Sequence, residues 1–450
     1  MFGTSGIRGP VGEDVTAALA LEVGRALGVD ADRVVVGRDP RESGRLLLDA
    51  LAAGLRESGT DVRDLGLAAT PTVARAVGWE GADAGVAVTA SHNPPADNGL
   101  KLWQPSGQAF DAALRETITE RVRGDAATLA AWDGLGDRRR TRARERHREA
   151  ILEAVALPDP VSVVVDVGNG AGGLTAEALS ALGCTVRTLN AQPDGRFPGR
   201  PSEPTADHCT DLAALVGTDG ADLGIAHDGD ADRTRAVAAD GTFLSGDETL
   251  ALLAAEAAGA GDTVAVPVDT SLAVADHLAA RDVDVTYTPV GDVYVAAAAS
   301  EPGVVFGGEP SGAWIWPEET LCPDGPLAAC RLAAMAAAEP LAARAAAVPT
   351  YPIKRESIPV EDRAAVMADV TERVRAREAE VSTLDGVRVD RGDAWFLVRA
   401  SGTEPLVRVT AEAREADRAA ALLAEARELV TAAAEDRGEK EKGDRRADGL

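Results

Sequence analysis

The sequence contains few of the residues that build zinc sites, disulfide frameworks or membrane spans. Its 450 residues include four cysteines and five histidines. The cysteines form no CxxC pair and the histidines no pair at metal-ligand spacing, so we expect no zinc site and free thiols in a reducing cytoplasm. No apolar run approaches ~20 residues, and the first residues lack a basic segment followed by an apolar one. We therefore expect neither a membrane span nor a secretory signal.

Positive charge is also scarce. The net charge of −27 argues against a nucleic-acid partner, because phosphate backbones repel an acidic surface. The only lysines are Lys101, Lys354, Lys440 and Lys442. Together with abundant alanine, this composition indicates a halophilic protein, a trait that concerns solubility and not fold. A lysine within a motif is therefore unusual here.

What the sequence does contain is a pattern that occurs three times. A β-branched run ends at a turn at residues 34–39, 163–169 and 264–270. Each run is followed by a stretch of helical period and a second strand, near residues 61–65, 184–189 and 283–288. A third strand then leads into an unusual loop, at residues 89–93, 227–232 and 307–312. Alternating strands and helices predict three similar α/β domains with mostly parallel sheets. Ligands of such sheets bind beyond the carboxyl ends of the strands, so the three loops are expected to face one cleft.

The pattern changes from about residue 346. A polar helix is predicted at 360–380, followed by strands at 386–390, 394–400 and 406–411 and an alanine-rich helix to about 434. This order indicates a smaller α+β domain. Residues 138–149 are expected to form an exposed linker and the start of a helix. The charged segment 435–450 has no apolar residues to bury, which predicts a disordered tail.

Asp228, Asp230 and Asp232 are the strongest candidates for a metal site. Carboxylates at alternate positions repel one another unless a hard cation joins them, and oxygen ligands favour magnesium or calcium. A calcium EF-hand is excluded, because its required Gly and Glu positions hold Arg233 and Ala239. A solvated acidic turn is the alternative.

Ser91 follows another strand, within Thr89-Ala90-Ser91-His92-Asn93-Pro94. A nucleophilic serine needs a base or a cation within reach, and Lys101, His92 and Arg8 are the candidates. The motif is not the Gly-x-Ser-x-Gly turn of hydrolases. A serine that only shapes a turn is the alternative interpretation.

Two further loops suit a phosphorylated sugar. Glu309 and Ser311 offer a carboxylate and a hydroxyl on a glycine-rich loop, which suits neighbouring sugar hydroxyls, although a structural turn is equally compatible. A strand-loop-strand segment offers arginines, hydroxyls and free backbone N–H groups to a phosphate, with a plain hairpin as the alternative. Its residues are Arg399, Ser401, Gly402, Thr403 and Arg408. One such loop per domain indicates phosphoryl transfer on a phosphorylated polyol.

The chain resembles the α-D-phosphohexomutase superfamily over essentially its whole ordered length. The motifs that carry the resemblance are residues 3–9, 89–94, 228–233, 308–312 and 399–405. The opening and residues 395–399 look most like archaeal phosphoglucosamine mutases. One departure is Ala313, which stands where many relatives have histidine, so an acid/base role of that histidine must be absent or belong to another group.

The resemblance implies four domains around a central cleft: residues 1–142, 143–241, 242–345 and 346–434. It implies a phosphoserine at Ser91, and one Mg²⁺ held by Asp228, Asp230, Asp232 and an oxygen of that phosphate. Glu309 and Ser311 would bind the sugar hydroxyls, and Arg399, Ser401, Gly402, Thr403 and Arg408 the phosphate that is not transferred. Arg8, Lys101 and Arg233 would line the reacting end.

The expected activity is the interconversion of hexose 6-phosphate and hexose 1-phosphate through a sugar bisphosphate, with glucosamine phosphate as the expected substrate. The alternatives are glucose, mannose or pentose phosphates, a phosphatase with a phosphoserine intermediate, and a non-catalytic sugar-phosphate sensor. We expect a cytoplasmic monomer or homodimer with a small-molecule phosphosugar as its partner, and no nucleic-acid or membrane partner.

Overall fold

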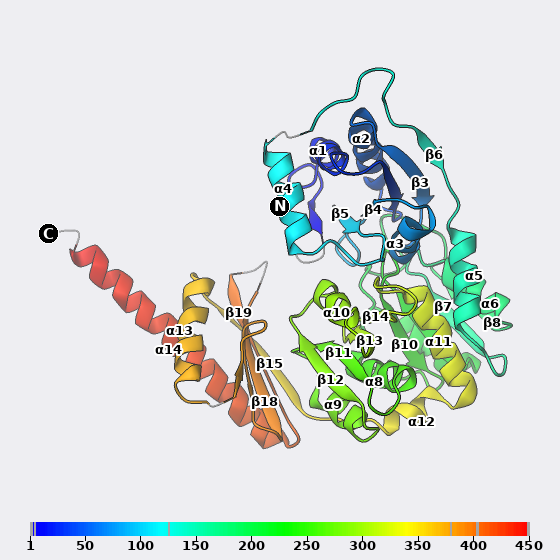
Figure 1. Cartoon of the computed structure of the whole chain (residues 1–450). Helices are drawn as coiled ribbons and strands as arrows, with labels where there is room; N and C mark the ends of the chain where they lie inside the picture. The colour runs from blue at the N-terminus through cyan, green and yellow to red at the C-terminus, as the bar shows by residue number, and fades with distance from the viewer. Residues whose placement is uncertain (1–2, 4–5, 125–126, 379, 402–404, 448–450) are drawn as a thin grey trace.

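The computed structural model describes residues 3, 6–124, 127–378, 380–401 and 405–447, and builds them into four sheets with their helices (Figure 1). The first sheet has the strand order β1 (Ile7–Pro10), β5 (Asp97–Trp103), β4 (Ala84–Val88), β2 (Arg33–Arg38), β3 (Asp61–Leu67), β6 (Arg138–Arg140). The second has the order β10 (Thr234–Ala238), β9 (Leu223–His227), β7 (Ser162–Asp166), β8 (Thr185–Leu189). The third has the order β12 (Asp284–Thr288), β11 (Thr263–Pro267), β13 (Val304–Glu309), β14 (Ala313–Ile315). The fourth has the order β15 (Ile353–Pro359), β19 (Leu406–Ala413), β18 (Ala394–Ala400), β17 (Val387–Asp390), β16 (Val381–Ser382).

Each sheet with its helices is called a domain here. The helices of the first domain are α1 (Ala17–Leu27), α2 (Gly44–Glu57), α3 (Thr70–Trp79) and α4 (Ala112–Gly124). Those of the second are α5 (Arg144–Ala154), α6 (Leu174–Ala181) and α7 (Thr210–Asp219). Those of the third are α8 (Gly246–Ala257), α9 (Leu272–Ala279), α10 (Asp292–Ala299), α11 (Gly325–Ala338) and α12 (Leu341–Ala346). The fourth has α13 (Arg363–Arg375) and α14 (Ala416–Ala447).

The first sheet is covered on both faces, as its continuous apolar strands predict. Alternate residues of a strand point to opposite faces. Val34 and Val36 of β2 accordingly pack into the core beneath α1 and α2, whereas Val35 packs with α3. The three similar α/β domains and the smaller C-terminal domain are thus confirmed as a fold class.

The sheets are less uniformly parallel than expected. In each of the first three domains the third strand of the repeat, β4, β9 or β13, is followed at once by an antiparallel neighbour, β5, β10 or β14. The three unusual loops are therefore hairpin connections. They lie at the carboxyl ends of β4, β9 and β13, as predicted.

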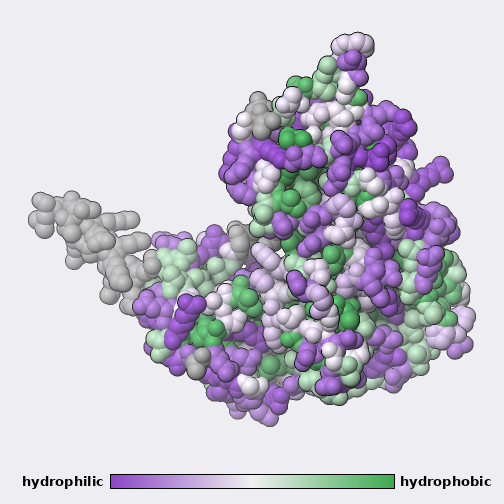
Figure 2. Space-filling model, viewed as in Figure 1, coloured by the Kyte–Doolittle hydropathy of each residue, from purple (hydrophilic) through white to green (hydrophobic). Residues whose placement is uncertain are grey.

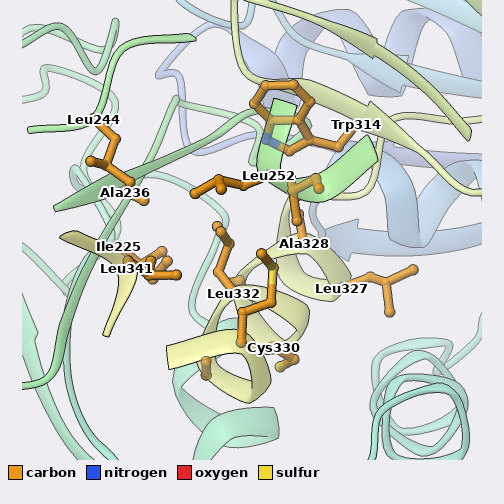
Figure 3. Packing of buried hydrophobic residues seen from close by; sticks show 14 of the residues in the cluster. Ile225, Ala236, Leu244, Leu252, Trp314, Leu327, Ala328, Cys330, Leu332 and Leu341 are labelled. Atoms are coloured by element: carbon orange, nitrogen blue, oxygen red, sulfur yellow. The ribbon is translucent and has the colours of Figure 1, made fainter. Parts of the chain in front are cut away.

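The second and third domains share one hydrophobic core. Side chains from β9 and β10 of the second sheet pack with α8, α11 and α12 and with Trp314 of the third domain (Figure 3). Ile225, Ala236, Leu252 and Leu332 are wholly or almost wholly buried in this cluster. The two sheets are therefore held together by packing and not only by the connecting chain.

The fourth domain is an antiparallel sheet with α13 and α14 packed on one face. Its other face contacts the third domain. Glu412 of β19 accepts hydrogen bonds there from Ser271 Oγ (2.5 Å), Leu272 N (2.8 Å) and Trp395 Nε1 (2.6 Å). A buried carboxylate with three donors is well satisfied, so this contact fixes one end of the fourth domain on the third.

Two expectations about local structure were wrong, and one strand was not predicted. Residues 138–140 form the edge strand β6, parallel to β3, instead of an exposed linker. The edge strand β15 was missed, because its sequence, IKRESIP, shows no alternation of apolar and polar residues. The predicted disordered tail continues α14 to Ala447, since its Glu, Lys, Arg and Ala residues are good helix formers. Figure 1 shows this helix projecting away from the other domains.

The visible face is mostly hydrophilic, with apolar residues in small scattered patches (Figure 2). Among the described residues, no helix combines the length and apolar character that crossing a bilayer requires.

Candidate functional site

Ser91 lies in the hairpin connection between β4 and β5 and is buried. Its hydroxyl donates a 2.5 Å hydrogen bond to Asp228 Oδ2, and its Oγ lies 3.2 Å from His92 Nδ1. Burial, reinforced by the nearby cations of Arg233 and Arg8, lowers the pKa of His92 to about 2. His92 is therefore neutral near pH 7. Its ring can accept a hydrogen bond, but it cannot supply a positive charge.

Asp228, Asp230 and Asp232 form one cluster after β9. One carboxylate oxygen from each lies within 4.8 Å of the others, and all three side chains are buried. Asp230 Oδ1 and Asp232 Oδ1 are buried with no hydrogen-bond partner among the described residues. Buried carboxylate oxygens without a donor are costly, so the donor set fits a hard divalent cation. The acidic turn is not solvated, which removes the alternative interpretation.

Lys101 of β5 lies against the same cluster. Its Nζ is 3.0 Å from Asp230 Oδ2 and also pairs with Asp232. Burial by itself lowers the pKa of Lys101, but Asp230 and Asp232 outweigh burial and raise it, so the lysine is charged. Asp230 also accepts a 2.7 Å hydrogen bond from Thr70 Oγ1 at the start of α3. The first domain thus brings both the serine and a cation to the candidate metal loop (residues 227–232) of the second domain.

Glu309 ends β13 and is 8% exposed. Its Oε1 accepts a 2.8 Å hydrogen bond from Gly291 N, and its Oε2 accepts a 3.2 Å one from Ser311 Oγ. Burial, and then the neighbouring Asp292, raises the pKa of Glu309 to about 7. The carboxyl group is held in place by these two contacts, and with this pKa it is about half protonated near pH 7, so it can donate as well as accept a hydrogen bond.

Arg399 is near the end of β18, and its Nε lies 3.0 Å from Asp385 Oδ2 of the same domain. Arg408 of β19 is its partner across the sheet. Ser401 is buried, and its carbonyl accepts a hydrogen bond from Arg363. The predicted Gly402 and Thr403 lie outside the described residues.

One cavity of about 260 Å³ joins residues from all four domains. Ser91 lines it with Arg233 of the second domain, Glu309 of the third and Arg399 of the fourth. The other predicted site residues on its wall are Arg8, Lys101, Asp232 and Ser311. Ala313 also lines the cavity. The other described site residues, His92, Asp228, Asp230, Ser401 and Arg408, are not among the lining residues.

Two charged cavity residues were not predicted from the sequence, Asp269 and Asp292. Asp269 follows the first strand of the third repeat, at the position that Asp39 has in the first repeat. That repeated position was a signal that could have identified it. Asp292 begins α10 just after Gly291, and nothing in its sequence context distinguishes it from a helix-start aspartate.

Family comparison assigns all four domains. Models of the phosphoglucomutase/phosphomannomutase family match residues 1–128 (α/β/α domain I), 145–241 (domain II), 245–351 (domain III) and 356–429 (C-terminal domain). The chain belongs to this family. It is accordingly an intramolecular phosphotransferase of the phosphohexomutase type, and the resemblance stated from its motifs is confirmed.

Individual relatives agree over nearly the whole chain. It is 44% identical to a probable phosphoglucosamine mutase of Methanopyrus kandleri over 447 residues, 97% of this chain and 98% of that one. It is also 44% identical to a probable phosphoglucosamine mutase of Methanosarcina barkeri over 420 residues, 92% and 95% of the two chains. A crystal structure of a phosphoglucomutase/phosphomannomutase family protein from Burkholderia thailandensis superposes with a TM-score of 0.85 at 28% identity, covering 96% and 98%.

Proposed function

We propose that the protein interconverts glucosamine 6-phosphate and glucosamine 1-phosphate by carrying a phosphoryl group on Ser91. The observation that carries this proposal is the shared cavity, in which Ser91, the metal loop, Glu309 and Arg399 meet. Curated relatives named phosphoglucosamine mutase support the choice of glucosamine.

The residues around Ser91 would have two tasks in phosphoryl transfer, metal binding and stabilisation of negative charge. Asp228, Asp230 and Asp232, with an oxygen of the phosphorylated Ser91, would hold one Mg²⁺ per chain. The ion would neutralise charge on the phosphoryl oxygens. Arg8, Lys101 and Arg233 place fixed positive charge on the same side of the cavity, where it stabilises the charge that develops on the transferred group. Neutral His92, beside the serine oxygen, would be the remaining catalytic residue at this end of the site.

Glu309 and Ser311 would bind the sugar, and the fourth domain its far end. Glu309 has an oxygen fixed by Gly291 N and faces the cavity, which suits adjacent sugar hydroxyls. Arg399, Ser401, Gly402, Thr403 and Arg408 would hold the phosphate that is not being transferred. A sugar bisphosphate would then be both the intermediate and the activator, because it can return either phosphate to Ser91.

The protein would be phosphorylated at rest and would act in the cytoplasm as a monomer or homodimer. Its charge of −27 would suit a high-salt solvent. Dividing the chain after residues 142, 241 and 345 remains a prediction.

The test is to incubate the protein with glucosamine 6-phosphate, Mg²⁺ and glucosamine 1,6-bisphosphate. Formation of glucosamine 1-phosphate, with one phosphate on the Ser91 peptide by mass spectrometry, is the expected result. Net release of inorganic phosphate would support a phosphatase instead, and no turnover of any sugar phosphate would support a sensor. A matching panel with glucose and mannose 6-phosphates measures kcat/KM, and a higher value for either would overturn the choice of glucosamine.

A further inference from the structure

The backbone at Ser91 has a conformation that side chains rarely adopt. Its φ angle is 51°, in the left-handed region, although the residue is not glycine. Such a conformation is strained for a residue with a side chain and persists only where the surroundings hold it. The structure must therefore contain groups that fix this peptide, and they determine where the serine oxygen points.

Arg41 is the principal group that does so. Its side chain is fully buried between β2 and α2. The guanidinium donates to four backbone carbonyls of the serine loop: Ser91 O (2.9 Å), Asn93 O (2.6 Å), Pro94 O (2.5 Å) and Asp97 O (2.8 Å). Its Nε donates to Asp39 Oδ2 at 3.0 Å. All five N–H donors of a guanidinium are therefore used, four of them on one loop.

Asp39 extends the same arrangement to the other side of the Ser91 peptide. It accepts a 2.8 Å hydrogen bond from Thr89 Oγ1, and Thr89 Oγ1 in turn accepts one from Ser91 N at 2.8 Å. The N–H of Ser91 is thus tied to Asp39 through Thr89, and its carbonyl is tied directly to Arg41. Both ends of the residue are fixed by one ion pair.

The second domain closes over this ion pair. Ser202 Oγ donates a 2.8 Å hydrogen bond to the same Ser91 carbonyl, and the Phe197 ring lies 5.0 Å from the Arg41 guanidinium. The backbone at Gly195 packs so closely against Arg41 that a Cβ at residue 195 would lie 2.5 Å from Arg41 Cα. The segment that contains these residues also belongs to the domain of the metal loop, so the serine and the metal loop are positioned against a common support.

We propose that Arg41, with Asp39, is a positioning residue that keeps the Ser91 oxygen directed at Asp228 during phosphoryl transfer. This proposal rests on the proposed function. Arg41 touches neither the cavity nor a reacting atom, so it acts only through the loop it binds. Lysine cannot replace it, because an ammonium has three donors and no planar fork with which to reach four carbonyls.

The test compares Arg41→Lys with Arg75→Lys. Arg75 is a similarly buried arginine, paired with Asp324 at 2.7 Å, and it contacts no atom of the serine loop. We expect kcat of Arg41→Lys to fall at least about tenfold with KM for the sugar phosphate within about twofold. The rate at which a sugar bisphosphate phosphorylates Ser91 should fall by the same factor, whereas Arg75→Lys should affect only thermal stability.

Two further variants, Ser202→Ala and Arg41→Ala, test the proposal if Arg41→Lys does not fold. Ser202→Ala removes one donor to the Ser91 carbonyl without touching a buried charge, and it should lower kcat by a few fold at constant KM. Arg41→Ala should regain turnover when guanidinium or methylguanidinium is added. Native kcat in folded Arg41→Lys, a kcat loss no larger than that of Arg75→Lys, or absence of rescue overturns the proposal. Lack of mutase turnover in the wild-type protein would instead refute the proposed function.

Discussion

Lys101 Nζ lies 3.0 Å from Asp230 Oδ2, inside the protein and between its first two domains. This oxygen belongs to the cluster that we propose binds Mg²⁺, so the ammonium and the ion share the same carboxylates. Lys101→Met should therefore bind Mg²⁺ more tightly, because a competing charge is removed. Turnover should nevertheless fall about a hundredfold or more, because the transferred group loses a fixed cation. Calorimetric titration with Mg²⁺ and steady-state kinetics measure the two effects.

The exposed Lys354 on β15 provides the control for this change. Lys354→Met should leave both Mg²⁺ affinity and turnover unchanged. Weaker Mg²⁺ binding in Lys101→Met would contradict the arrangement in which the lysine and the metal share carboxylates.

Asp228 is the carboxylate that accepts from the Ser91 hydroxyl, at 2.5 Å. Asp228→Asn keeps the shape of the side chain and removes its charge. We expect kcat to fall by about two orders of magnitude or more with little change in melting temperature. In the wild type, a chelator should abolish activity and Mg²⁺ should restore it. Asp240→Asn, in the exposed turn after β10, serves as the control, and Mg²⁺-independent turnover at the normal rate would disprove the metal assignment.

Arg399 should act on both phosphate isomers alike. The bisphosphate presents either end to Ser91, so one distal site must hold the 1-phosphate and the 6-phosphate in turn. Losing a charge-assisted arginine contact costs about 1.5–3 kcal/mol, or roughly ten- to a hundredfold. Arg399→Ala should lower kcat/KM by this factor, equally in both directions because the equilibrium constant fixes their ratio, while Ser91 can still be phosphorylated. Arg427→Ala, an exposed change in α14, is the control, and an unchanged kcat/KM in Arg399→Ala would contradict a phosphate-binding role.

Glu309 should make stability depend on pH. Its pKa is raised to about 7 in the folded protein, by burial first and by Asp292 next. A carboxyl group with a raised pKa stabilises the fold fully below its unfolded value near 4.5, and this contribution is lost as the pH rises to 7. The loss is on the order of 2–3 kcal/mol. Melting temperatures at pH 5 and pH 8 should therefore differ more in the wild type than in Glu309→Gln. Glu318→Gln, an exposed change in the same domain, should keep the full wild-type difference.

The sequence allowed the α/β repeats and the placement of their loops to be predicted, because both depend on local order. Strand β18, predicted at residues 394–400, has those bounds in the structure. Each site motif directly follows a strand or precedes one, so the carboxyl-edge rule brings Ser91, Asp230 and Glu309 together without knowledge of the packing between domains.

What could not be predicted depends on long-range contacts. Arg41 follows a strand whose end was recognised, yet its role depends on carbonyls about fifty residues further along. Because every residue has a backbone carbonyl, the sequence does not indicate which carbonyls accept hydrogen bonds from Arg41. The antiparallel strand β14 was missed because three residues carry no periodicity. The helical tail was misjudged because lack of apolar residues argues against burial, and burial is not needed for a helix that continues a packed one.

The hydrophobic core that spans the second and third sheets has a thermodynamic consequence. Residues such as Ile225 and Leu332 belong to different domains by sequence but lose the same neighbours when either sheet opens. The two sheets should consequently melt in one cooperative transition, with the fourth domain, whose core beneath α14 is separate, free to melt in another. Differential scanning calorimetry should resolve fewer heat-absorption peaks than there are sheets. Cleaving the chain after residue 241 should yield two fragments that are unstable apart and regain structure only when mixed.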